Sequence, residues 1–218
     1  MKFESDICDR PDLRLELELH KHGYRLVAGL DEAGRGAWAG PVTAGVIILP
    51  IDQSDLLEEL DGVRDSKVLS VKQRLYWEDI LKRIALAWGV GMVSALDLDR
   101  LGLIAATRLA MQRAIDALTS QPEYLLIDHL LLPENSLPQT ALPRGDASVL
   151  SISSASILAK VARDRKMIEY DSQYPGYGFA RHKGYGTPQH QAALNKLGAS
   201  ALHRTSFAPI ARLHSQIA

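Results

Sequence analysis

Acidic residues stand at two places in the sequence where hydrophobic segments end. Asp31 and Glu32 close one such segment and open the glycine-rich turn 33–40, and Asp128 closes the apolar run 124–127. Carboxylates at these positions are well placed for chemistry, because open sheets gather ligands at the carboxyl ends of parallel strands. Neighbours on a regular strand point to opposite faces, so Glu32 can share a site with Asp31 only if it departs from strand geometry, which the glycines permit.

Carboxylates gathered in this way repel one another unless a cation lies among them. Oxygen-only ligands favour hard ions such as Mg²⁺ and Mn²⁺. Two such ions roughly 3.5–4 Å apart can activate a water and stabilise the leaving oxygen of a phosphodiester, with no histidine needed as the base. Spacing alone does not show that the acids meet in space, and the alternative for Asp128 is a capping or turn residue.

The hydrophobic pattern predicts which elements carry these residues. Short apolar runs predict strands over residues 24–31, 41–49, 85–93 and 124–128. Apolar residues at helical spacing predict helices over residues 70–84, 97–118, 150–170 and 188–197, the first of them capped by Ser70. Turn-forming residues predict loops over 53–70 and 174–187. This order of elements predicts an α/β fold with a mixed β-sheet flanked by helices.

Length and composition fit one globular domain in a reducing compartment. The chain has 218 residues, of which 46% are hydrophobic and 23% charged, values typical of a soluble protein. A single cysteine, Cys8, excludes an internal disulfide. Residues 1–14 lack the apolar stretch of a signal peptide, and no uncharged run, such as 84–96, reaches the roughly 20 residues that span a bilayer. We therefore expect a cytoplasmic protein that does not bind membranes.

Charge is divided unevenly along the chain. Residues 144–218 carry ten Lys and Arg against four Asp and Glu, a balance of +6, and residues 1–143 carry fifteen against twenty-two, a balance of −7, which together give the net charge of −1. An acidic region that could hold cations and a basic third that could meet phosphate would explain this division. A chance distribution over a solvated surface is the alternative.

The segment Val27–Pro41 (VAGLDEAGRGAWAGP) resembles the opening signature of ribonuclease HII, the bacterial type 2 ribonuclease H. Five further blocks resemble that family in the same order: Asp65-Ser66-Lys67, Tyr124–Asp128, Gly145-Asp146 with Ser151–Arg165, His182–Thr187, and His203–Arg212. The resemblance covers roughly residues 24–212, and six ordered blocks make it specific.

The resemblance implies a single ribonuclease H-like catalytic domain over 1–218. Its sheet and helix core would span about 1–170, and a substrate-binding loop with a helical C-terminal portion about 171–218. It also implies an active site that binds Mg²⁺ or Mn²⁺ through four carboxylates, those of Asp31, Glu32, Asp128 and Asp164.

The resemblance further assigns the residues that touch substrate. Gly34, Arg35 and Gly36 would contact the 2′-hydroxyl and the phosphates beside the scissile bond, because glycine backbones allow close approach. Tyr185 would stack on the deoxyribose that follows the ribonucleotide. Its flanking glycines predict a mobile backbone that leaves the ring free to be presented. Two lysines are further candidates for phosphate contacts, namely Lys160 and Lys183.

The activity implied is that of an endoribonuclease with nucleic acid as its partner. It would hydrolyse the RNA strand of RNA–DNA hybrids and cut at single ribonucleotides in duplex DNA, leaving 5′-phosphate and 3′-hydroxyl ends, and we expect a monomer. Two alternatives remain. A resolvase-like nuclease of the same superfold would share the carboxylates without needing the turn or Tyr185. A catalytically silent hybrid-binding module would lack at least one acid, and none is missing.

A few residues depart from the family pattern or suggest other chemistry. His129, Ala37 and Arg144 stand where the family commonly has a small residue, a proline and a lysine, and none of them removes a proposed ligand. Ser156 and Lys160 have the spacing of a Ser–Lys nucleophilic pair, although most such pairs are structural. Four histidines lack zinc-ligand spacing and are expected to be structural or exposed, namely His182, His190, His203 and His214. The three tryptophans, Trp38, Trp77 and Trp88, are expected in the core.

Overall fold

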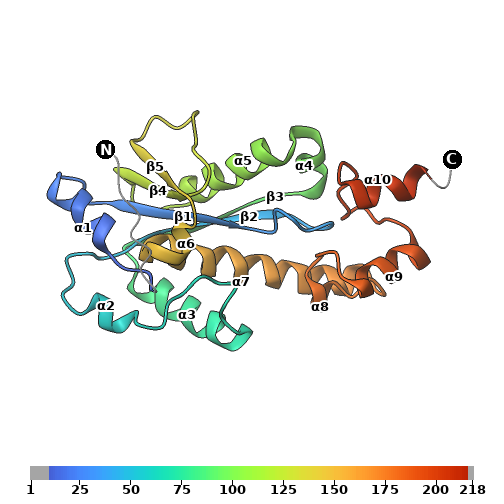
Figure 1. The fold of residues 1–218 in the computed structure, drawn as a ribbon, viewed down its shortest axis with the longest axis horizontal. Helices are drawn as coiled ribbons and strands as arrows, with labels where there is room; N and C mark the ends of the chain where they lie inside the picture. The colour runs from blue at the N-terminus through green and yellow to red at the C-terminus, as the bar shows by residue number, and fades with distance from the viewer. Residues whose placement is uncertain (1–9, 216–218) are drawn as a thin grey trace.

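The computed structural model describes residues 10–215, which excludes Cys8. Five strands form one mixed sheet in the order β3-β2-β1-β4-β5 (Figure 1). Their bounds are β1 Val27–Ala33, β2 Val42–Ile48, β3 Ala87–Val93, β4 Tyr124–Asp128 and β5 Gln139–Leu142. The pairs β1–β2 and β2–β3 are antiparallel, and the pairs β1–β4 and β4–β5 are parallel. The predicted mixed α/β sheet is confirmed, and β5 is a strand that the sequence did not predict.

Helices cover both faces of this sheet (Figure 1). The 24-residue helix α7 (Leu150–Gln173) crosses one face, with α3 (Val71–Ile84) packed against it, and α5 (Leu103–Asp116) covers the other. Glycines in the strands let these helices come close. A Cβ at Gly45 would lie 2.4 Å from a backbone oxygen of α7, and one at Gly91 would lie 2.1 Å from a backbone oxygen of α5. The close packing of α7 fixes what its side chains can reach.

Local signals explain where the main helices begin and end. The predicted cap of α3 is confirmed, because Ser70 and Gln73 form a reciprocal capping box. The predicted helix 97–118 is instead two helices, α4 (Ala95–Leu101) and α5, because Gly102 lies between them with a φ of 80°. The shorter helices are α1 Arg14–Lys21, α2 Leu56–Glu59 and α6 Gly145–Ser148.

The C-terminal residues form a helical portion beyond the end of α7. It contains α8 (Phe179–His182), α9 (Pro188–Leu197) and α10 (Ala208–Ser215), at the right of Figure 1. Its small core is shared with the turn after β1 and with α7, and consists of Ala39, Met167, Tyr177, Phe179, Leu194 and Ile210. This portion therefore rests directly on the glycine-rich turn.

None of the helices formed by residues 10–215 combines the length and the apolar character that crossing a bilayer requires.

Candidate active site

A cavity of about 480 Å³ opens where β1 and β4 end. Acidic residues line one part of it, basic and glycine residues line the rest, and the full lining is Asp31, Glu32, Ala33, Gly34, Arg35, Gly36, Ser66, Lys67, Arg74, Asp128, Lys160 and Tyr185. The structure therefore brings together eight of the ten residues predicted for the site. The two that do not line the cavity are Asp164 and Lys183.

Asp31 and Glu32 both border the cavity although both stay in strand β1. Glu32 remains paired with Ala44 of β2, so the expectation that it must leave strand geometry is wrong. Pairing of β1 with β4 ends at Leu30 and Ile127. Asp31 and Asp128 are the next residues of their strands after this last pair, and both line the cavity.

Asp31 is the most deeply placed of these acids, with 3% of its surface exposed. One carboxylate oxygen accepts a hydrogen bond of 2.6 Å from the backbone N–H of Glu32. Burial, followed by the nearby charges of Glu32 and Asp128, raises the pKa of Asp31 well above its usual value. Burial and the neighbouring carboxylates therefore disfavour the charged form of Asp31.

Only one of the two carboxylate oxygens of Glu32 has a hydrogen-bond partner. Its Oε1 atom accepts a hydrogen bond of 3.1 Å from Arg35 Nη1, and its Oε2 atom is buried without a hydrogen-bond partner. Burial raises the pKa of Glu32 even though Arg35 opposes the shift. One carboxylate oxygen is thus free to take a ligand.

Asp128, at the end of β4, stands next to an acid that the sequence analysis did not select. Its Oδ1 atom accepts a hydrogen bond of 2.8 Å from Gly145 N–H. Burial, followed by the charge of Asp146, raises the pKa of Asp128 to about 6. Asp146 is itself 5% exposed and also contributes to the raised pKa of Asp31.

Lys67 supplies a positive charge to this acidic group. Its Nζ atom lies 2.6 Å from Asp146 Oδ2. Burial lowers the pKa of Lys67, but the bond to Asp146 and the charges of Asp146, Asp65 and Asp31 outweigh burial and raise it overall. Asp146 therefore faces the same acidic group as Asp31 and Asp128.

Asp164 lies in a different setting. Its Oδ1 atom is 2.6 Å from Lys160 Nζ and its Oδ2 atom is 3.7 Å from Arg74 Nη2. Two cations that line the cavity thus neutralise Asp164, and the structure does not group it with Asp31. Asp146 was missed because the block that resembles the family contains both acids, and spacing could not show which one turns toward β4.

The acidic group fits a hard divalent cation. Among residues 10–215, no three His, Cys, Asp or Glu side chains already converge in the arrangement of a formed metal centre. The donor set is nevertheless oxygen-only, three of its carboxyls have raised pKa values, and Glu32 Oε2 lacks a partner. A bound cation would relieve both the repulsion and the unsatisfied oxygen.

The glycine turn and Tyr185 form a further part of the cavity lining. Gly34 has a φ of 90°, and a Cβ there would lie 1.9 Å from Arg163 Nε, so glycine is required. The half-buried Tyr185 ring lies 5.2 Å from Arg163 Cζ and 5.7 Å from Lys160 Nζ. The backbone N–H of Tyr185 donates to His182 O at 3.0 Å.

The glycines beside Tyr185 make close contacts, and the mobility expected of its loop stays a prediction. Gly184 is buried, and a Cβ on it would lie 2.3 Å from Ala39 O. His190 Nδ1 lies 3.0 Å from Tyr185 O. Gly184 is therefore needed for close packing. Lys183 adopts a φ of 53°, and its ammonium group donates to Ala180 O.

The remaining expectations have mixed outcomes. Ser156 Oγ donates to Ser153 O and accepts from Ser66 N–H, and Lys160 bonds Asp164. Ser156 and Lys160 therefore do not form a nucleophilic pair.

Three histidines are buried and structural, as expected: His182, His190 and His203. The side chain of His214 is outside the described structure. Trp38 and Trp77 pack partly against core clusters, whereas Trp88 is 36% exposed beneath Lys82.

The three departures from the family pattern leave the acids in place. His129 and Arg144 take left-handed backbone conformations with φ of 63° and 60°, and Ala37 is fully buried.

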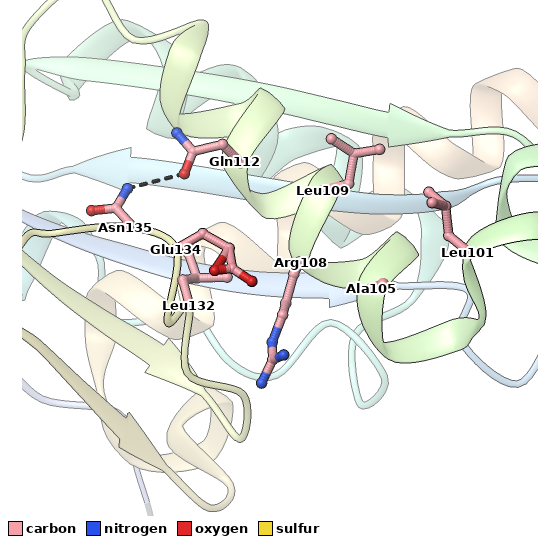
Figure 2. Close-up of a pocket in the computed structure, with 8 residues that line it drawn as sticks. All are labelled: Leu101, Ala105, Arg108, Leu109, Gln112, Leu132, Glu134 and Asn135. Carbon is pink, nitrogen blue, oxygen red and sulfur yellow. Dashed lines mark hydrogen bonds between the residues drawn. The ribbon is translucent and has the colours of Figure 1, made fainter.

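A second, largely apolar groove of about 330 Å³ lies on the α5 side of the sheet (Figure 2). It is lined by Leu101, Ala105, Arg108, Leu109, Gln112, Leu132, Glu134 and Asn135, with a 3.0 Å hydrogen bond from Asn135 to Gln112. It holds one acid and shares no lining residue with the first cavity.

Comparison with known proteins points to one family. The family model described as Ribonuclease HII matches residues 28–210. A ribonuclease HII of Thermus thermophilus is 51% identical over 187 residues, which are 86% of this chain and 88% of the relative. That of Chloroflexus aurantiacus is 50% identical over 205 residues, which are 92% of this chain and 94% of the relative.

Solved structures show the same architecture. The ribonuclease H2 of Pyrococcus horikoshii OT3 superposes with a TM-score of 0.73 at 25% identity, covering 87% of this chain and 97% of that one. Bst-RNase HIII, solved in complex with Mn²⁺, superposes with a TM-score of 0.65 at 17% identity over 92% of this chain and 72% of that one. The second likeness is one of fold alone.

Proposed function

This chain belongs to the ribonuclease HII family and is an endoribonuclease that degrades the RNA strand of RNA–DNA hybrids, and we propose that it also cuts at single ribonucleotides in duplex DNA. The observation that carries the proposal is one cavity with two sides. Acids with raised pKa values form one side, and the glycine turn with Tyr185 forms the other. One side fits metal-assisted hydrolysis, and the other fits the recognition of a sugar.

The acidic group that we propose to hold Mg²⁺ or Mn²⁺ consists of Asp31, Glu32, Asp128 and Asp146. The first three line the cavity, and Asp146 raises the pKa of two of them. A pair of divalent ions bound there would supply Lewis acidity and neutralise charge on the phosphodiester. Hydrolysis would leave 5′-phosphate and 3′-hydroxyl ends. The carboxylates hold the metal-binding geometry, and Lys67 balances their charge through Asp146.

Asp164 takes a different role in this proposal from the one expected from sequence. Its bond to Lys160 orients the ammonium group at the cavity wall. Lys160 is then positioned to contact a phosphate of the substrate. Asp164 acts as a positioning residue rather than as a fourth metal ligand.

The turn and the tyrosine select the substrate. The backbone of Gly34 to Gly36 and the Arg35 guanidinium border the cavity beside Glu32, where they can approach a 2′-hydroxyl and its phosphate. Tyr185 lines the same cavity, and a deoxyribose stacked on its ring would leave no room for a second 2′-hydroxyl. Lys183 adds positive charge next to Tyr185. Cytoplasmic location and a monomeric state complete the proposal.

Cleavage of three duplexes tests this function. The substrates are duplex DNA with one ribonucleotide, an RNA–DNA hybrid and all-DNA duplex, each with and without Mn²⁺. We expect metal-dependent cuts in the first two, with 3′-hydroxyl ends, and none in the third. Cleavage of all-DNA branched substrates instead would favour a resolvase, and binding without cleavage would favour a silent hybrid-binding module.

A further inference from the structure

Two arginines are fully buried beneath the turn that follows β1. Arg163, from α7, donates from Nε to Pro41 O at 2.9 Å and from Nη2 to Ala39 O at 3.1 Å. Arg204, from the C-terminal portion, donates from Nη1 to Arg35 O at 2.8 Å and from Nε and Nη2 to Gly40 O at 3.1 and 2.9 Å. Both are 0% exposed. Two guanidinium groups thus hold four carbonyl groups of one short turn.

Neither arginine has the partner that a buried charge normally requires. Among residues 10–215, no Asp or Glu oxygen lies within 4.0 Å of either guanidinium, and Arg163 Nη1 has no hydrogen-bond partner. Burial lowers the pKa of both groups, that of Arg204 to about 9. Burying a charge without an ion pair is unfavourable, and apolar residues often serve stability equally well. Stability alone therefore gives little reason to bury two guanidinium groups at this turn.

The same turn is tied to the loop that carries Tyr185. Trp38 N–H donates to Gly184 O at 2.8 Å, and Gly40 N–H donates to Leu202 O at 2.8 Å. Arg163 also lies under the Tyr185 ring, with Cζ 5.2 Å from its centroid. The turn and the Tyr185 ring are thus connected in two ways, through the contacts of Arg163 and through backbone hydrogen bonds.

We propose that Arg163 and Arg204 are positioning residues, which hold the Gly34–Gly36 turn and the Tyr185 ring at one fixed separation. This separation sets the spacing at which a ribose and the following deoxyribose are read together. The proposal rests on the proposed function, since it concerns how a single ribonucleotide is told from a continuous RNA strand. A long hybrid offers many registers and depends less on this spacing.

Lysine is the informative replacement, because it keeps the charge and loses the planar fork of donors. Arg163→Lys and Arg204→Lys each leave at least one turn carbonyl without its donor. We expect each to lower the rate on a single ribonucleotide by about 10-fold more than the rate on a long hybrid, the scale at which small misplacements act. The change should fall on kcat, because phosphate contacts that set KM are retained.

Arg165→Lys is the matched control. Arg165 lies on the same helix, is paired with Glu78 through bonds of 2.5 and 2.6 Å, and does not contact the turn. It should leave the ratio of the two rates unchanged. If Arg163→Lys and Arg204→Lys also leave that ratio unchanged, the proposal is overturned.

Hydrogen exchange in the unmodified protein tests the same claim without any variant. The backbone amides of Trp38 and Gly40 should exchange as slowly as those of α7, because the turn is held as one rigid unit. Exchange at the rate of an open loop would overturn the proposal even if the variants did not fold. A wild-type protein that protects these amides but does not cut at a single ribonucleotide would refute the proposed function and leave the rigid turn established.

Discussion

The acidic side of the cavity and the side formed by the turn with Tyr185 differ in how far their polar groups are satisfied. On the acidic side, Glu32 Oε2 is buried without a partner, and burial with mutual repulsion raises the pKa values of Asp31 and Asp128. On the other side, the backbone of the turn is held by Arg163 and Arg204 and by the Tyr185 loop.

This difference teaches which part of the reaction each side prepares. Unsatisfied carboxylates repel one another and so favour a cation that draws them together. A turn with its carbonyls bonded has little freedom left to lose when a sugar binds, which favours selectivity. In the proposed mechanism, the acidic side depends on an added cation, and the side formed by the turn with Tyr185, which reads the sugar, is formed in advance.

The largest effect is expected on the acidic side. Asp128→Asn removes a charge and little volume, so cleavage should fall by about 10²–10³-fold or more while hybrid binding is kept or improved. Rates with Mg²⁺ and affinities without it measure the two quantities. Asp79→Asn, on an exposed acid of α3, is the control. An undiminished Mg²⁺-dependent rate would remove Asp128 from the site and erase the difference between the two sides.

An intermediate effect is expected on the reading side. Tyr185→Ala removes a stacking contact worth roughly 1–3 kcal/mol by analogy with base–aromatic contacts. It should lose most cleavage of a single ribonucleotide, with less effect on a long hybrid, and Tyr185→Phe should largely keep activity. The ratio of the two rates at fixed salt and metal is the measurement. Equal losses on both substrates would mean that the ring supports the loop and does not read the junction.

A smaller effect concerns the positive charge of the C-terminal third. Hybrid affinity should fall with salt at a log–log slope of about −0.9 per phosphate contacted, or somewhat less for a hybrid than for B-DNA. Lys183→Ala should flatten that slope slightly, and Lys196→Ala, on an exposed position of α9, should not. An affinity that does not depend on salt would show that the uneven charge of residues 1–143 (−7) and 144–218 (+6) has no relation to substrate binding.

The smallest effect on activity is expected at Glu16, a buried carboxylate away from the cavity. Its Oε1 atom accepts from Ser151 N–H at 2.9 Å, and burial raises its pKa to about 7. Because this folded-state pKa is above the unfolded one, Glu16 lowers the free energy of unfolding as pH rises from about 4.5 to about 7. Glu16→Gln should remove this loss. The free energy of unfolding of the variant should exceed that of the wild type by up to about 3 kcal/mol above pH 7, with little difference below pH 4.5.

Denaturant unfolding of wild type and Glu16→Gln across this pH range measures the difference. Cleavage should stay near the wild-type rate, which separates a buried acid from an acid of the site. A stability difference that does not depend on pH would contradict the raised pKa.

The sequence predicts the sheet and the long helices because their apolar patterns are regular. The helix predicted over 150–170 is found at Leu150–Gln173, and four of the five strands lie close to their predicted places. The strand Gln139–Leu142 was missed because it has four residues and is half-buried at all of them. Its position at the edge of the sheet depends on its pairing with β4, and no local sequence pattern shows that pairing.

The site is predicted less completely, for physical reasons that concern individual residues. Asp31, Glu32 and Asp128 end apolar runs, and this local signal places them correctly at the cavity. Asp146 depends on the fold, because only the pairing of β4 with the segment after β5 brings it near Asp128. Arg163 and Arg204 would be expected on the surface, since arginines are rarely fully buried. Their roles emerge only from the contacts they make.

The most direct test compares Asp146→Asn with Asp164→Asn in single-turnover cleavage of a duplex with one ribonucleotide, across a range of Mn²⁺ concentrations. If Asp146 belongs to the acidic group and Asp164 only orients Lys160, the first variant should lose about 10²-fold or more and need more Mn²⁺, while the second loses about 10-fold or less with its Mn²⁺ dependence unchanged. The reverse order, with Asp164→Asn shifting the Mn²⁺ dependence and Asp146→Asn leaving it unchanged, would contradict the account.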